Sequence, residues 1–165
     1  MTDHDTLEQI RQLKYRYLRC LDLKLWDEFA ETLTDDVTTD YGAHLSFAGK
    51  KAVVDYMSGA LGPEIITVHQ VHHPEITVDG DTATGTWYLE DKVIITQYRM
   101  LLTGAAFYTD TSRREADGAW RIAHTGYVRS YEATQSLDDM PSWQLIANRW
   151  GETPASDPID RSHAV

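Results

Sequence analysis

Apolar side chains in the first third of the chain recur at the three- and four-residue steps that are typical of an amphipathic helix. The pattern predicts a helix over about residues 5–21, whose inner stripe consists of Leu7, Ile10, Lys14, Tyr17 and Leu21. Shorter helices are predicted over residues 26–33 and 50–61, and the later of the two ends before a Gly-Pro pair. Between them, residues 37–41 and 44–47 predict a small hairpin.

Beyond residue 64 the pattern changes to the alternation of apolar and polar residues that is expected of β-strands. Turns around Gly80 and Gly118 divide this region into hairpins. The predicted strands are 75–78, 82–96, 101–112 and 119–131. A last helix is predicted over residues 141–150, because Pro141 stands near its start and apolar residues share one stripe after it.

Helices followed by a long antiparallel meander are typical of the α+β class. We expect one domain over residues 1–150, in which three or four helices wrap a curved, mostly antiparallel sheet around a deep, cone-shaped pocket. The Pro-containing, polar segment 151–165 is expected to form a flexible tail.

The charge balance restricts the classes of partner. The 165 residues contain 15 Lys and Arg against 26 Asp and Glu, which gives a net charge of −11. So acidic a surface repels phosphate groups, which argues against nucleic acid and an anionic membrane as partners. A single cysteine, Cys20, excludes an internal disulfide and a cysteine-based zinc site. The polar N-terminus and the lack of a long apolar run in the sequence indicate a cytoplasmic protein.

Two polar residues of the first predicted helix are unusual for their positions. Tyr17 lies on the apolar stripe, where its phenol is either a core hydroxyl bonded to the backbone or part of an interior site. Asp22 falls at the helix C-terminus, where the helix dipole disfavours an anion. It either caps the next helix or serves a site, and the pattern alone does not decide between these roles.

Strand parity singles out two more charged residues. Asp91 shares the apolar face of its strand with Trp87, so it is either an inward carboxylate that needs a partner or the first residue beyond the strand. Arg129 is in phase with Tyr127 on the last predicted strand. It is a pocket cation, a counter-ion to Asp91 or a surface charge.

The segment His69-Gln70-Val71-His72-His73 holds three histidines within five residues. A metal site is one interpretation, but no paired acidic or cysteine ligand stands at a familiar spacing, and we expect no metal. In an extended segment His69 and His73 face one side and His72 the other. A neutral imidazole in a pocket, with an ordinary pKa of about 6.5, is better suited to act as a general base.

Three parts of the chain resemble the SnoaL-like branch of the nuclear-transport-factor-2-like superfamily, and within it the bile acid 7α-dehydratases of gut bacteria. They are residues 13–28 (LKYRYLRCLDLKLWDE), 67–91 (TVHQVHHPEITVDGDTATGTWYLED), and 104–110 with 125–132 (GAAFYTD and TGYVRSYE). The resemblance implies a cone-shaped α+β fold. It also implies active-site positions at Tyr17, Asp22, His69, Asp91 and Arg129.

The chemistry implied by the resemblance is the elimination of water from a steroid with a 3-oxo-4-ene system, without a metal or organic cofactor. His69 would be the base, with Asp91 orienting it. Tyr17, with Asp22, would serve the oxyanion or the leaving hydroxyl, and Arg129 would balance the carboxylates or bind the polar end of the substrate. Further contacts to the small hydrophobic polycyclic ligand are expected from Trp87, Tyr127, His73 and Phe107. A homodimer or homotrimer is expected on the same ground.

Two other functions stay open at this point. An isomerase of the ketosteroid type would use the same base and oxyanion donor without releasing water. A non-catalytic carrier would only bind a hydrophobic ligand. A carrier gains nothing from interior ionisable groups that are costly to desolvate, so the five polar positions favour an enzyme.

Overall fold

The protein consists of three α-helices and a six-stranded sheet in the part of the chain that the structure, a computed structural model, describes: residues 4–42 and 45–151. The helices are α1 (His4–Leu23), α2 (Trp26–Glu31) and α3 (Lys50–Ala60). The strands are β1 (Leu33–Asp40), β2 (Ser46–Ala48), β3 (Ile65–Asp79), β4 (Thr82–Ile95), β5 (Met100–Arg114) and β6 (Trp120–Ser136). Single turns of 3-10 helix follow β4 and β6, at η1 (Thr96–Tyr98) and η2 (Leu137–Asp139).

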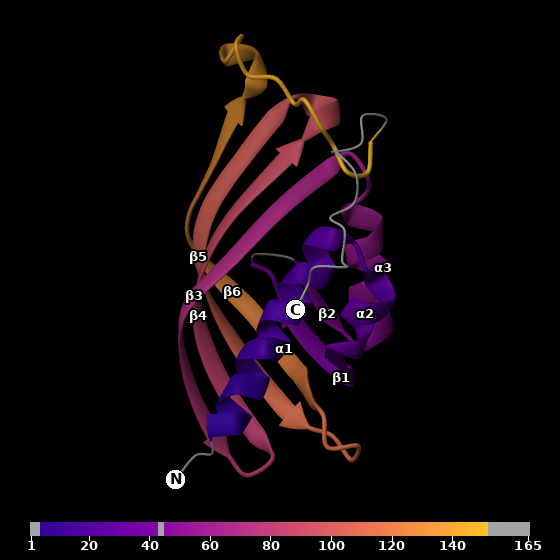
Figure 1. The fold of residues 1–165 in the computed structure, drawn as a ribbon, viewed down its shortest axis with the longest axis vertical. Helices are drawn as coiled ribbons and strands as arrows, with labels where there is room; N and C mark the ends of the chain where they lie inside the picture. The colour runs from indigo at the N-terminus through magenta and orange to yellow at the C-terminus, as the bar shows by residue number, and fades with distance from the viewer. Residues whose placement is uncertain (1–3, 43–44, 152–165) are drawn as a thin grey trace, which may run out of the picture.

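The sheet is mixed and strongly bent, with the strand order β2-β1-β6-β5-β4-β3. Neighbouring strands are antiparallel except β1 and β6, which run parallel. Figure 1 shows the sheet curving around the three helices, which all lie on its inner side. This arrangement confirms the predicted α+β class.

The core lies between α1 and the inner face of the sheet. As the periodicity predicts, one stripe of α1 is buried, with Ile10, Tyr17 and Leu21 each at most 3% exposed. Burying an aliphatic side chain of this size contributes about 1.5–3 kcal/mol, so this stripe fixes α1 across the sheet. The second helix is shorter than the predicted 26–33, because Leu33 begins β1 and pairs with Ile122 of β6.

The histidine segment lies inside a much longer strand than the predicted 75–78. Strand β3 begins at Ile65 and stays paired with β4 to Asp79, with a bulge between His72 and Glu75. His73 takes a positive φ of 48° there, so Pro74 is accommodated by an irregularity and does not end the ladder.

The predicted helix over residues 141–150 is wrong. After η2 the chain runs as turns and irregular structure back toward the helices (Figure 1). The Leu137 N–H donates to the Arg99 carbonyl, and Asn148 Nδ2 donates to the Pro63 carbonyl at 3.2 Å. These contacts tie the segment to the loop after β4 and to the loop before β3. The predicted tail lies, apart from Gly151, outside the described residues, as does His44 of the predicted hairpin.

None of the described helices is both long enough and apolar enough to cross a membrane. The cytoplasmic location stays a prediction.

Candidate active site

A cavity of about 160 Å³ lies between the inner face of the sheet and helices α1 and α3. Five of the nine residues singled out from the sequence line it: Tyr17, His69, Asp91, Tyr127 and Arg129. The rest of the wall is mostly apolar or aromatic, with Met57 and Leu61 from the α3 side and Leu89 from β4. Concave, mainly apolar sites with a few converging polar groups are the usual form of small-molecule sites.

His69 is held by Asp22 through two hydrogen bonds. The imidazole Nδ1 lies 2.6 Å from Asp22 Oδ1, and the His69 backbone N–H donates to Oδ2 at 2.9 Å. Thr67 Oγ1 also donates to Asp22 Oδ1, at 2.8 Å. Because a carboxylate only accepts, the proton of a neutral His69 lies on Nδ1 and its Nε2 has the free lone pair. This tautomer is the one a general base needs.

The pairing explains why an aspartate ends α1. Its charge opposes the helix dipole, which costs up to about 1 kcal/mol at an exposed helix end. The donors from Thr67 and His69 on β3 compensate the carboxylate of Asp22. The expectation that Asp91 orients His69 is therefore wrong: Asp91 lies opposite His69 in the β3–β4 register, but Asp22 bonds to the ring.

Asp91 is instead paired with Arg129. The guanidinium donates from Nη1 to Oδ1 at 2.6 Å and from Nη2 to Oδ2 at 2.8 Å, while Asp91 is only 3% exposed. Of the three alternatives for Arg129, the structure excludes the surface charge, since Arg129 is a counter-ion to Asp91 and also lines the cavity. The carboxylate raises the pKa of Arg129, although burial opposes this, so the guanidinium stays charged. The fork-to-fork geometry fixes both groups in the cavity wall.

Gly104 of β5 makes this ion pair possible. The guanidinium has to cross β5 to reach from β6 to β4, and it passes over Gly104. A Cβ at position 104 would lie 2.5 Å from Arg129 Nη1 and 2.9 Å from Asp91 Oδ1. A side chain there would displace the pair.

The phenol of Tyr17 is bonded to the phenol of Tyr41, at 2.7 Å between the hydroxyl oxygens. The expected link from Tyr17 to Asp22 is therefore wrong. Burial is the largest cause that raises the pKa of both Tyr17 and Tyr41. Both are therefore protonated near neutral pH, and since one hydroxyl donates to the other, the second keeps its proton for another acceptor.

A buried ion pair lies against these phenols, and the sequence reasoning missed it. Lys14 Nζ contacts both carboxylate oxygens of Asp110, at 3.1 and 2.9 Å, and lies 3.5 Å from the centre of the Tyr108 ring. Burial lowers the pKa of Lys14, and the charge of Asp110 opposes that effect. The sequence period places Lys14 on the apolar stripe of α1, and a charge on that stripe is the only signal of the pair in the sequence.

Only one of the four expected ligand-contact residues lines the cavity, namely Tyr127. Trp87 faces inward but is 2% exposed, packed among core residues in contact with α1, where no space is left for a ligand. Phe107 and His73 lie on the outer face of the sheet, each against Tyr88. The expectation that Trp87, Phe107 and His73 contact the ligand is therefore wrong.

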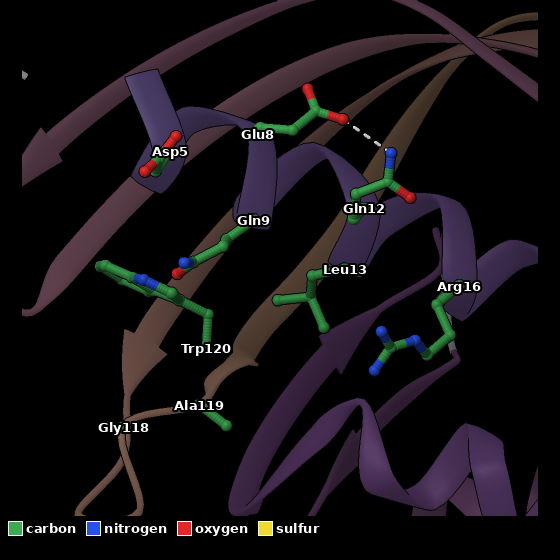
Figure 2. A pocket seen from close by; sticks show the side chains of 9 residues that line it. All are labelled: Asp5, Glu8, Gln9, Gln12, Leu13, Arg16, Gly118, Ala119 and Trp120. Carbon is green, nitrogen blue, oxygen red and sulfur yellow. Dashed lines mark hydrogen bonds between the residues drawn. The ribbon is translucent and has the colours of Figure 1, made fainter. Parts of the chain in front are cut away.

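A larger, open hollow of about 520 Å³ lies beside the N-terminal half of α1, at the β5–β6 turn. Figure 2 shows its wall, in which Gln12 donates to Glu8 at 2.7 Å and the Trp120 indole lies beside Gln9. None of the residues singled out from the sequence lines this hollow. Among the described residues no group of three or more His, Cys, Asp or Glu side chains is placed to hold a metal ion.

The structure is an α+β arrangement of a curved, mixed sheet and three helices, and its cavity combines a carboxylate-bound histidine, a pair of phenols and a fixed ion pair. Over residues 3–126 the sequence matches the model of the SnoaL-like domain, and the chain belongs to this family. An uncharacterized protein of Mycobacterium tuberculosis is 29% identical over 120 residues, which cover 72% of this chain and 80% of that protein.

Two solved structures show the same fold at low identity. A hexachlorocyclohexane dehydrochlorinase (LinA) of type 2 matches with a TM-score of 0.73 and 19% identity, over 80% of this chain and 90% of that one. A putative scytalone dehydratase of Novosphingobium aromaticivorans matches with a TM-score of 0.73 and 19% identity, over 96% and 99% of the two chains. Both names are those of enzymes that eliminate a small molecule.

Proposed function

We propose that this protein is a cofactor-independent lyase that eliminates water from a cyclic substrate by general acid–base catalysis. One observation carries the proposal: His69, with Nδ1 held by Asp22, shares a cavity with the Tyr17 phenol and the Asp91–Arg129 pair. The two elimination enzymes among the structural neighbours support the same reaction class.

The site residues suit three parts of such an elimination. Nε2 of His69 takes a proton from a carbon whose carbanion is conjugated to a carbonyl group and which lies next to the carbon that bears the hydroxyl. The linked Tyr17 and Tyr41 hydroxyls donate to the enolate oxygen that forms. The guanidinium of Arg129 stabilises negative charge nearby. The C–O bond then breaks, the hydroxide takes up the proton from His69, and water leaves. A single acid or base contributes about 10²–10⁴-fold to such a rate.

The size and charge of the cavity restrict the reacting part of the substrate. A cavity of about 150 Å³ accommodates benzene, so the 160 Å³ here encloses about one ring. The side chains of Arg129 and His69 are each paired with a carboxylate, which favours an uncharged reacting ring. The specific form of the proposal is a 7-hydroxylated 3-oxo-4-ene steroid of the bile-acid type. Its reacting atoms span two fused rings, so it would place one of these rings inside the cavity and the remaining rings at the mouth.

The proposal is tested with purified protein and a panel of cyclic hydroxyketones, from one-ring compounds to 7-hydroxylated 3-oxo-4-ene steroids as free acids and thioesters. The expected result is a longer conjugated chromophore and a product lighter by one water in the mass spectrum. A product of unchanged mass with a shifted double bond would identify an isomerase. Tight binding without any product across the panel would identify a carrier and reject the proposal.

We also propose that copies of the chain associate into a homodimer or homotrimer through the outer face of the sheet. Tyr88, Phe107 and Val128 are 52%, 45% and 76% exposed and occupy one row across β4, β5 and β6. Sedimentation of wild type and the Phe107→Lys variant tests this, and a wild-type monomer at micromolar concentration would reject it.

A further inference from the structure

We propose that a second opening, a groove between α1 and β3, is the route by which the proton of His69 exchanges with solvent while substrate fills the cavity. This inference rests on the proposed function. It concerns the outer side of the His69–Asp22 pair, to which the elimination scheme assigns no role.

His69 and Asp22 stand between two spaces. The inner one is the cavity of about 160 Å³, which His69 lines and Asp22 does not. The outer one is a groove of about 370 Å³, which both residues line together with Arg19, Leu23 and others from α1 and Val71 from β3. The groove exists because β3 is the edge strand of the sheet, so no further strand covers it beside α1.

The exposed fractions of the His69 and Asp22 side chains agree with this division between an inner cavity and an outer groove. The Asp22 side chain is 22% exposed and the His69 side chain 12%, although Asp22 does not reach the inner cavity. The carboxylate therefore meets solvent on the groove side. Nδ1 points to Asp22, and Nε2 is the nitrogen left for the inner cavity. The two nitrogens thus serve two different spaces.

This geometry gives the base a proton path that substrate does not block. His69 starts neutral, protonated at Nδ1, and becomes an imidazolium when Nε2 takes the substrate proton. The Nδ1 proton can pass to Asp22 and on to a water molecule in the groove, which leaves a neutral ring protonated at Nε2. When Nε2 gives its proton to the departing hydroxide, a proton from the groove restores Nδ1–H. Over the cycle the groove gains and returns one proton, so only water leaves the substrate.

The test compares two bulky substitutions on opposite sides of the pair. Arg19 is an exposed residue of α1 that lines the groove, so Arg19→Trp obstructs it without entering the core. Ala60 is exposed at the end of α3 and lines the inner cavity, so Ala60→Trp obstructs that side. Arg19→Gln controls for the lost charge. Arg16→Trp controls for added bulk, since it lies on the same helix but lines the other hollow.

The readout is the exchange of the His69 Nδ1 proton with water, followed by NMR on protein labelled with nitrogen-15 in histidine. We expect Arg19→Trp to slow this exchange at least tenfold, and Ala60→Trp, Arg19→Gln and Arg16→Trp to change it less than twofold. Unchanged exchange in Arg19→Trp, or slower exchange in Ala60→Trp, would overturn the proposal.

This measurement needs no substrate, so it can fail while the proposed lyase activity stands, and the reverse also holds.

Discussion

The two faces of the sheet are built from alternate residues of the same strands, yet they hold their polar groups in opposite ways. On the inner face, Asp91 and Asp110 are 3% and 4% exposed, and each is held by a basic side chain. On the outer face, large side chains such as Tyr88 and Phe107 are about half exposed. An interior ionisable group is costly unless it is paired, so the inner carboxylates are fixed in position, whereas the large outer side chains meet solvent. Substitutions should therefore act very differently on the two faces.

Two histidines of β3 give the largest expected contrast. His69→Ala removes the proposed base and should lower turnover by about 10²–10⁴-fold. His72→Ala removes an exposed ring that shares the outer row with Tyr88, and it should leave kcat/KM within about twofold. Steady-state kinetics of both variants checks this, with circular dichroism to confirm the fold. Equal losses in the two variants would remove His69 from the mechanism.

Two lysines give the corresponding contrast in stability. Lys14→Met leaves Asp110 buried without its partner, which should cost about 3–5 kcal/mol in the free energy of unfolding. Lys92→Met, at an exposed position of β4, should change it by less than about 0.5 kcal/mol. Urea unfolding measures both. A loss below about 1 kcal/mol for Lys14→Met would show that Asp110 finds other partners.

Substitutions of two glycines distinguish an effect on the position of the Asp91–Arg129 pair from an effect on the fold. Gly104→Ala should push the Arg129 guanidinium off Asp91 and lower kcat by about 10–100-fold, since small displacements at a reacting site are costly. The fold should survive, because alanine suits a strand better than glycine does. Gly59→Ala, where a Cβ meets nothing within 4 Å, is the control and should be as active as wild type. A fully active Gly104→Ala variant would show that the ion pair does not contribute.

The smallest effect concerns the phenols at high pH. Burial raises the pKa of Tyr17, Tyr41 and Tyr108 in the folded protein. A group with a raised folded pKa contributes stability that is complete below its unfolded value, about 10 for tyrosine, and is lost as the pH rises above it. We expect the free energy of unfolding to fall above about pH 10, and less steeply in Tyr41→Phe. Urea unfolding between pH 8 and 11 on a ~1-unit grid tests the slope, and equal slopes would contradict this assignment.

The residues that face the interior could be predicted, because the local periodicity of a helix or strand determines which side chains point inward. Helical spacing placed Tyr17 on the buried side of α1, and strand alternation placed Asp91 on the buried side of β4. Both periods are local properties of the backbone, so a single sequence contains them. The same alternation assigns Phe107 and Tyr108 to opposite faces, and it could have excluded Phe107 from the pocket.

The partners of these residues could not be predicted in the same way. Asp22 and His69 are 47 positions apart, and their contact depends on where α1 ends relative to the register of β3. Arg129 reaches Asp91 only because β6 carries a bulge that shifts its register against β5 between Ala105 and Ala106. The hydrogen bond of Tyr41 with Tyr17 and that of Lys14 with Asp110 likewise join segments that are distant in the sequence. The resemblance implied five site positions, but it did not indicate which of them bond to each other.

The parallel pairing of β1 with β6 also has a consequence for biosynthesis. Strand β1 joins the sheet through Leu33 opposite Ile122 and Asp40 opposite Gly126, so its closing partner is the last of the described strands to leave the ribosome. Until then the emerged α1 has only part of its final packing surface, and its apolar stripe stays open to aggregation or to chaperones. The cavity is therefore completed only after most of the chain has been translated. We expect substitutions in β6 to reduce the yield of folded protein more than equivalent substitutions in β3.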